Sequence, residues 1–258
     1  MCMYTYEWEV TILSHIIKKL TKSYIDDALV RLAYNSSAIE GNTITLPETA
    51  TIIINQTLPN NSKITNREYF EVLNHQPAFE YMFRNIKNKA LSVSIIKETH
   101  EILTDRLQHD KGMFKIYPNH VSGTEFNTAL PENVPALMNQ LVSNLSYRIN
   151  QPISDEEVIK AILEAHITFE RIHPFSDGNG RTGRLIMIYS LLENNLPPLI
   201  IKNKDKNSYL NILHNAQIKD APSDDDIQQF YAFALPLLLE EEKRIDSFYH
   251  QKLQQIEL

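Results

Sequence analysis

Glycine is almost absent from this chain outside one short stretch. The sequence holds 6 glycines in 258 residues, and 3 of them lie in HPFSDGNGRTGR, residues 173–184, called the motif segment below. Glycine is the usual residue of tight turns and bulges, so a chain with so little of it favours helices over turn-rich sheet. We therefore expect an all-α protein with one segment of unusual backbone.

The composition is that of an ordinary folded protein with an acidic balance. Apolar residues make up 43% of the chain and charged residues 22%, and the net charge is −7. No dense Lys/Arg block could neutralise the phosphates of a polymer, and no apolar run reaches membrane-spanning length. The single cysteine, Cys2, fits a reducing compartment. We expect a cytoplasmic protein with neither a nucleic-acid nor a membrane partner.

Residues 26–41, DDALVRLAYNSSAIEG, have the pattern of a helix that ends at Glu40. Asp26 can cap its start, and Gly41 suits the left-handed residue that stops a helix. The apolar positions with helical spacing are Leu29, Leu32, Ala33 and Ile39.

Two further helices are predicted on either side of the motif segment. In residues 154–172, Ser154 and Glu157 form a capping box ahead of one apolar stripe, so this helix delivers His173 at its C-terminal end. Residues 181–195 continue as a second helix. The stripe consists of Val158, Ile162, Ala165 and Phe169.

The rest of the chain gives coarser signals. Residues 94–107 read as a helix, and two more helices follow residue 203, the last bent or broken near Pro236. Between them, residues 111–135 mix Gly, Pro, Asn and Ser with short β-prone pieces, which favours an irregular hairpin. This hairpin either covers a site or is a plain surface loop.

The motif segment has the residues of an anion site. Gly178, Asn179 and Gly180 can form a nest of backbone amides at the start of a helix, where the helix dipole also favours negative charge. Arg181 and Arg184 share a face of that helix and can grip more than one phosphate.

Asp177 and His173 add the remaining chemistry of a nucleotide site. Asp177 offers one hard carboxylate, which suffices for Mg²⁺ when substrate phosphates and water supply its other ligands. His173 can act as a general base near neutral pH. Taken singly, each of these residues could be a turn former, a surface charge or a helix-end residue. Taken together, they favour a site where backbone touches phosphate.

The motif segment resembles the signature of the Fic (Fido) family, HxFx[D/E]GNGRxxR, at every specified position. The resemblance implies an all-α, Fic-type helical bundle with a small β-hairpin flap. It also implies an enzyme that transfers AMP from ATP to a hydroxyl side chain of a target protein, with Mg²⁺ bound.

The resemblance implies a role for each residue of the motif segment. His173 would activate the target hydroxyl, Phe175 would anchor the segment in the core, and Asp177 would hold Mg²⁺ against the α- and β-phosphates. The implied phosphate-binding residues are Gly178, Asn179 and Gly180 as the anion hole, with Arg181 and Arg184 on the β- and γ-phosphates.

Residues 112–135, called the flap segment below, resemble the hairpin that docks the target's backbone by strand addition in this family. Lys115 stands where family members often have Arg. His166 matches a family position, yet a packed, hydrogen-bonded role fits a buried helix face better. Tyr209 lies where relatives contact the adenine base, and packing is an equal alternative.

The stretch SSAIEGN resembles the family's inhibitory pattern [S/T]xxxE[G/N] through Ser36, Glu40 and Gly41. Its position implies the class that carries an inhibitory helix in the same chain. A carboxylate at a helix C-terminus faces the negative end of the dipole and requires a cation, which Arg184 would supply. Arg184 could then no longer hold the γ-phosphate.

These inferences divide the chain into an N-terminal helical region at 1–90 with the inhibitory helix, a Fic core at 91–235, and a C-terminal helix at 236–258. The leading function is an autoinhibited protein adenylyltransferase. Two alternatives remain: removal of AMP with Glu40 orienting water, and a nucleotide-sensing or toxin-type binding module without relevant catalysis. Dimers are common among such relatives, so a homodimer is one assembly that the resemblance allows.

Overall fold

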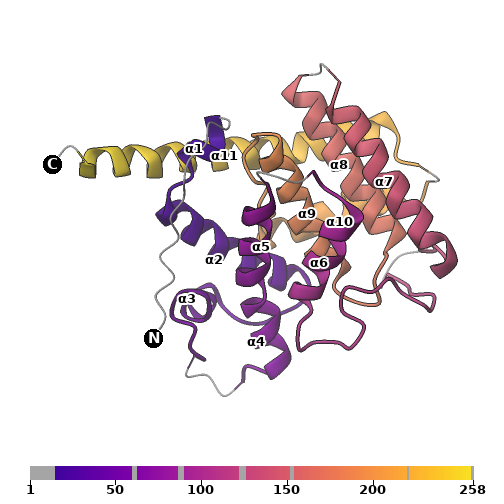
Figure 1. Ribbon diagram of the computed structural model, residues 1–258, viewed down its shortest axis with the longest axis horizontal. Helices are drawn as coiled ribbons and strands as arrows, with labels where there is room; N and C mark the ends of the chain where they lie inside the picture. Colours follow the sequence, from indigo (N-terminus) through magenta and orange to yellow (C-terminus); the bar gives the residue numbers. More distant parts are fainter. Residues whose placement is uncertain are drawn as a thin grey trace.

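The computed structural model describes residues 15–59, 63–86, 90–121, 126–151, 154–219 and 221–256; Cys2 and part of the flap segment lie outside this set. All regular elements in these ranges are helical, which confirms the all-α prediction (Figure 1). The helices are α1 (His15–Lys19), α2 (Lys22–Ile39), α3 (Leu46–Asn55), α4 (Asn66–Leu73), α5 (His75–Ile86), α6 (Val93–Leu103), η1 (Pro131–Asn133), α7 (Val134–Ile149), α8 (Asp155–Ile172), α9 (Asn179–Glu193), η2 (Asn203–Asp205), α10 (Lys206–Gln217) and α11 (Asp224–Ile256).

Helix α9 lies at the centre of the bundle (Figure 1). Every residue from Arg181 to Leu192 is buried, and its side chains reach three separate core clusters. A helix covered on all sides is typical of the interior of a large domain. The motif segment leads directly into this helix, so its position is fixed by the core.

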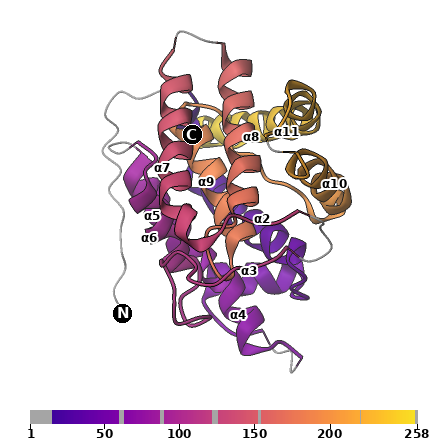
Figure 2. The ribbon, with the colours of Figure 1, turned by 90° about the vertical axis from the view of Figure 1, so that its right-hand side faces the viewer.

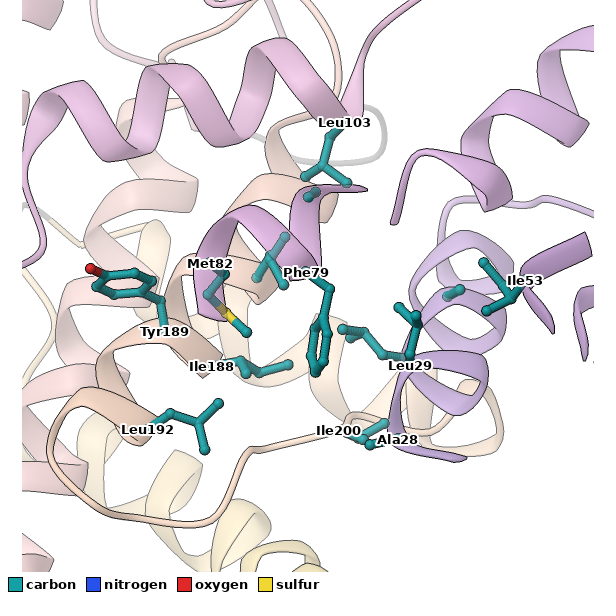
Figure 3. Packing of buried hydrophobic residues seen from close by; sticks show 14 of the residues in the cluster. Ala28, Leu29, Ile53, Phe79, Met82, Leu103, Ile188, Tyr189, Leu192 and Ile200 are labelled. Atoms are coloured by element: carbon teal, nitrogen blue, oxygen red, sulfur yellow. The ribbon is translucent and has the colours of Figure 1, made fainter. Parts of the chain in front are cut away.

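The first core cluster joins the N-terminal helices to α9. It takes side chains from α2, α3, α5, α6 and α9, and Figure 3 shows Phe79 of α5 drawn between Leu29 of α2 and Ile188 of α9. Burying such side chains is worth roughly 1.5–3 kcal/mol each. The C-terminal end of α2 therefore has a fixed place relative to the start of α9.

The other two clusters cover the remaining faces of α9. Helices α8, α10 and α11 supply most of the second cluster, while α6, α7 and α8 enclose Phe175 in the third. Figure 2 shows α7 and α8 side by side, with α10 and α11 beyond α8. No helix in the described ranges is both long and apolar enough to cross a membrane.

The helix starts show how local capping decides boundaries. The capping box of Ser154 and Glu157 is present at α8, as predicted. The predicted start of α2 at Asp26 is wrong. The N-cap is Thr21, whose hydroxyl accepts a hydrogen bond from the Tyr24 amide. Asp26 lies one turn inside the helix, where it pairs with Lys22.

The helix ends depend more on distant contacts. Glu40 caps the C-terminus of α2 and Gly41 follows with φ +97°, as the sequence indicates. Helix α6 ends at Leu103, before the predicted residue 107, because the Asn74 amide donates to the carbonyls of Leu103 and Asp105.

Helix α11 runs unbroken for 33 residues through Pro236. The helix is therefore not broken at this proline, although a break is one of the two outcomes, a break or a bend, that the sequence predicts. Buried residues on both sides of it hold the helix against the rest of the bundle, which offsets the missing backbone hydrogen bond. They are Ile227, Phe230, Ala234, Leu238 and Ile245.

The expected hairpin is not found in the described part of the flap segment, which contains no strand; residues 122–125 fall outside it. The reason lies in where its hydrogen bonds go. The Lys115 amide donates to the Pro174 carbonyl of the motif segment, at 2.9 Å, and the Thr128 hydroxyl donates to the Asn119 carbonyl, at 2.7 Å. These contacts replace a cross-strand ladder.

We expect Ser154→Ala to lower the free energy of unfolding by about 1 kcal/mol, because it removes the side-chain acceptor at the N-terminus of α8. Urea unfolding followed by circular dichroism measures this change. Ser143→Ala, at an exposed position inside α7, is the matched control and should change stability by less than about 0.5 kcal/mol. Equal losses in the two variants would contradict the prediction.

Candidate functional site

Two left-handed residues shape the motif segment. His173 ends α8 as its C-cap with φ 51°, and Gly178 begins α9 as its N-cap with φ 78°. A Cβ at Gly178 would lie 2.8 Å from the Thr104 Cγ2 atom, so both backbone angle and space require glycine there. The chain thus turns sharply between two packed helices.

Asn179 and Phe175 hold this turn closed. The Asn179 side chain accepts from the Phe175 amide at 2.9 Å and donates to the Phe175 carbonyl at 2.8 Å. The Phe175 ring is fully buried, where it stacks on His100 with ring centroids 3.7 Å apart. The side chain of Asn179 therefore serves the shape of the turn, while its amide lies in the first turn of α9.

Within the described ranges, only one ring nitrogen of His173 has a hydrogen-bond partner. Its Nδ1 atom lies 3.3 Å from the Glu170 carbonyl, which can only accept, so Nδ1 carries the hydrogen and Nε2 is the basic atom. Burial is the main cause that lowers the pKa of His173 to about 4, and the nearby Lys115 charge acts in the same direction. The imidazole is neutral at physiological pH and able to accept a proton.

The first turn of α9 offers unfilled donors. Among the described residues, no side chain caps this helix, and the Nε and Nη1 atoms of Arg181, whose side chain is 3% exposed, have no hydrogen-bond partner. Its Nη2 atom lies 3.7 Å from Glu71. Buried donors without an acceptor are costly, and a phosphate is the kind of group that would satisfy them. The site fits a nucleotide's phosphates on this observation.

Three of the five N–H donors of Arg184 bond to the C-terminal end of α2. Its Nη2 atom donates to a Glu40 carboxylate oxygen at 2.7 Å and to the Ser36 carbonyl at 2.9 Å, and its Nε donates to the Ser36 hydroxyl at 3.1 Å. A Cβ at Gly180 would lie 2.3 Å from the same carboxylate oxygen. The Glu40 carboxylate therefore lies directly against the first turn of α9.

Asp177 is paired with the N-terminal region as well. Its Oδ2 atom accepts from Arg67 of α4 at 2.5 Å, and its Oδ1 atom accepts from the Gly178 amide at 2.6 Å. Burial opposes ionisation of Asp177, yet Arg67 and Arg181 hold its pKa below the usual range. The described residues contain no group of three or more His, Cys, Asp or Glu arranged around a metal. One ionised carboxylate is nevertheless enough for Mg²⁺.

A cavity of about 290 Å³ lies between the end of α2, α4 and the motif segment. Its lining includes four carboxylates and two arginines, so it is strongly polar. The charged residues around it are Glu40, Arg67, Glu68, Glu71, Asp177 and Arg181.

The flap segment is tied to the motif segment through Lys115. This buried ammonium donates to Asn119 at 2.6 Å, to Thr128 at 3.0 Å and to the Ile172 carbonyl at 3.3 Å, and burial lowers its pKa to about 8. Asn119 in turn donates to the Phe175 carbonyl at 2.7 Å. Lysine can therefore serve at this position as a compact donor.

His166 and Tyr209 form a buried pair outside the cavity. Their side chains are hydrogen-bonded at 2.8 Å, and both residues are nearly inaccessible. This agrees with the packed role predicted for His166, and it favours packing for Tyr209.

The structure adds four residues that the sequence analysis missed: His100, Arg67, Glu71 and Asn119. Each contacts the motif segment or its arginines from a distant part of the chain. No local pattern singles them out, apart from the position of His100 on the buried face of a predicted helix.

A model of the Fic/DOC family matches residues 90–191. These residues form a Fic/DOC family domain. Among curated proteins, the chain resembles the protein adenylyltransferase Fic of Nematostella vectensis, 32% identical over 206 residues that cover 77% of this chain and 46% of the relative. It also resembles the protein adenylyltransferase Fic of Aedes aegypti, 30% identical over 210 residues, covering 80% and 40%. The chain thus spans less than half the length of these relatives.

Among solved structures, the chain resembles a Fic domain containing signaling protein from Bacteroides thetaiotaomicron. The two share 26% identity and a TM-score of 0.80, over 92% of this chain and 97% of that one. The likeness extends beyond the Fic domain itself, since it includes the helices on both sides of residues 90–191.

We expect Lys115→Gln to raise the pKa of His173, because it removes a positive charge that disfavours the imidazolium. NMR titration of the His173 ring proton between pH 3.5 and 8 measures this, with His173→Gln for assignment. Lys111→Gln, which removes an exposed charge paired with Asp105, is the control and should leave the titration of His173 unchanged. If the pKa of His173 is unchanged or lower in Lys115→Gln, the Lys115 charge does not lower the pKa of His173.

Proposed function

We propose that this protein is an autoinhibited protein adenylyltransferase that moves AMP from ATP to a hydroxyl side chain of a target protein. The observation that carries the proposal is a motif segment that places a neutral imidazole, His173, ahead of a helix whose first turn holds a buried arginine, Arg181, with two nitrogens that have no partner among the described residues. The names of the curated relatives support this reaction class.

In the proposed reaction, the target's hydroxyl oxygen attacks the α-phosphorus of ATP. A new P–O bond forms as the bond between the α-phosphorus and the bridging oxygen of the β-phosphate breaks, and pyrophosphate leaves. The hydroxyl proton passes to Nε2 of His173. The amides of Gly178, Asn179 and Gly180 would face the phosphate oxygens, where fixed dipoles stabilise the charge that develops.

Asp177 would hold Mg²⁺, which supplies charge neutralisation of the phosphates when bound. Arg181 and Arg184 would hold the β- and γ-phosphates, since both are planar donors suited to phosphate. The acids Glu40 and Glu71 lie near these guanidinium groups.

Autoinhibition follows from the contact between Glu40 and Arg184. An arginine held by three acceptors from α2 has no donor fork free for a γ-phosphate. ATP would have to displace Glu40 or bind in an unproductive pose, so the resting enzyme would be slow.

The flap segment is the proposed docking site for the target. Ile116 and Tyr117 are 73% and 76% exposed and follow Lys115, whose amide donates to the Pro174 carbonyl beside His173. Exposed apolar side chains beside an active site favour contact with a protein.

We expect Glu40→Gly to raise the transfer of labelled AMP to protein by about tenfold or more, since a hydrogen bond to a charged group is worth roughly 1.5–3 kcal/mol. Treatment of cell lysate with this variant and ATP, followed by mass spectrometry, measures transfer and names the nucleotide and the target residue.

Glu68→Gln is the matched control for this experiment. Glu68 lines the same cavity, but its carboxylate bonds to Thr43 and Thr65 and not to Arg184, so transfer should stay at the wild-type rate. Glu40→Gly/His173→Ala should abolish transfer. No increase in Glu40→Gly would remove Glu40 from the inhibitory role. The wild type should also be tested for both directions. If it removes AMP from modified target faster than it adds AMP to unmodified target, removal of AMP is the favoured function.

A further inference from the structure

His100 of α6 contacts the motif segment through two parts of its ring and the flap segment through a third. One face stacks on Phe175 at 3.7 Å with an interplanar angle of 2°. The Nε2 atom lies 2.9 Å from the Asp177 carbonyl, and the Nδ1 atom lies 2.9 Å from the Gly112 amide at the base of the flap segment. The residue is wholly buried.

These partners fix the tautomer of His100. A backbone amide can only donate, so Nδ1 must be the acceptor toward Gly112; a carbonyl can only accept, so Nε2 must carry the hydrogen toward Asp177. A protonated ring would place an N–H against the Gly112 N–H. Burial is the main cause that lowers the pKa of His100 to about 4, which maintains the neutral form at physiological pH.

The atoms that His100 holds are those that set the geometry of the turn. The Asp177 carbonyl belongs to the peptide that leads into Gly178, whose left-handed backbone starts α9. A Cβ at Gly178 would lie 3.4 Å from Nε2 of His100 and 2.8 Å from a methyl group of Thr104. The C-terminal end of helix α6 therefore packs directly against this turn.

We propose that His100 is a positioning residue for adenylyl transfer: it links the base of the flap segment to the peptide after Asp177 and so aligns the Asp177 carboxylate and the first amides of α9. The inference deepens the proposed function and rests on it for its catalytic meaning. Its mechanical part, that one ring holds the turn in place, is independent of any reaction.

Two substitutions separate the two ring nitrogens. In His100→Gln, the longer side chain can bring an amide N–H to the place of Nε2 and keep the bond to Asp177. In His100→Asn, the carbonyl oxygen can replace Nδ1 toward Gly112, and the bond to Asp177 is lost. Both variants remove the aromatic stack on Phe175, so the difference between them compares the loss of the Asp177 contact with the loss of the Gly112 contact.

The test combines two measurements in the Glu40→Gly background. Calorimetric titration with ATP, with and without Mg²⁺, reports how much affinity the metal adds. We expect the increase in ATP affinity on adding Mg²⁺ to be about tenfold smaller in His100→Asn than in the Glu40→Gly parent, in line with the loss of one buried hydrogen bond. In His100→Gln this increase should stay within about threefold of the parent value. Hydrogen exchange of residues 174–181 in the nucleotide-free protein should be faster in His100→Asn than in His100→Gln.

Tyr24→Phe is the control for a loss of stability alone. It removes a buried hydrogen bond to Glu241 far from the motif segment. It should lower the free energy of unfolding without changing the increase in ATP affinity on adding Mg²⁺ or the exchange of residues 174–181. If His100→Asn does not fold, His100→Phe takes its place, because it keeps the stack and loses both hydrogen bonds.

The outcomes separate this inference from the proposed function. If both His100 variants behave like Tyr24→Phe in calorimetry and exchange, the positioning role is overturned. If Glu40→Gly transfers no AMP and yet exchange differs between the two variants as expected, the positioning of the turn stands and adenylyl transfer fails.

Discussion

The burial of two arginines at the start of the central helix is the constraint on which the site depends. Arg181 and Arg184 are 3% and 4% exposed, in a helix that the core covers on every side. A buried guanidinium needs acceptors, because an unpaired buried charge is strongly destabilising. Glu40 and Ser36 meet this need for Arg184, while Arg181 has two carboxylates at longer range, Glu71 at 3.7 Å and Asp177 at 4.0 Å. Within one turn of helix, Arg184 thus has close hydrogen-bond acceptors and Arg181 does not.

Because the two arginines differ in their partners, phosphate binding would affect each of them differently. If phosphates bind at the start of α9, the donors of Arg181 gain partners, whereas Arg184 exchanges one set of partners for another. An exchange of partners has a smaller net free energy than the formation of a new contact, since the acid removed must be solvated again. Under the proposed autoinhibition, Glu40 would restrain the site with a single carboxylate while the fold stays intact.

The sequence predicts what depends on neighbours along the chain. The capping box at Ser154, the left-handed stop at Gly41 and the turn at Gly178 follow from local residue types, and the structure has all three. The contact between Glu40 and Arg184 joins positions 144 residues apart, and it was reached through the resemblance of a short motif. His100 and Arg67 contact Asp177 across 77 and 110 residues, and neither lies in a recognisable pattern. Such contacts depend on how helices pack, which periodicity alone does not specify.

Asp177, like Arg184, already has a partner that a bound ligand would have to replace, because it is paired with Arg67. Helix α4 packs with α2 and α3, so the acid that would hold Mg²⁺ and the arginine that would hold the γ-phosphate are both engaged by the N-terminal helices. Asp177 accepts from Arg67 and from the Gly178 amide, and both contacts favour its ionised form. A cation and Arg67 would compete for the same carboxylate oxygen. The charge that would suit Asp177 to Mg²⁺ is thus already present and paired, and metal binding there would also be an exchange of partners.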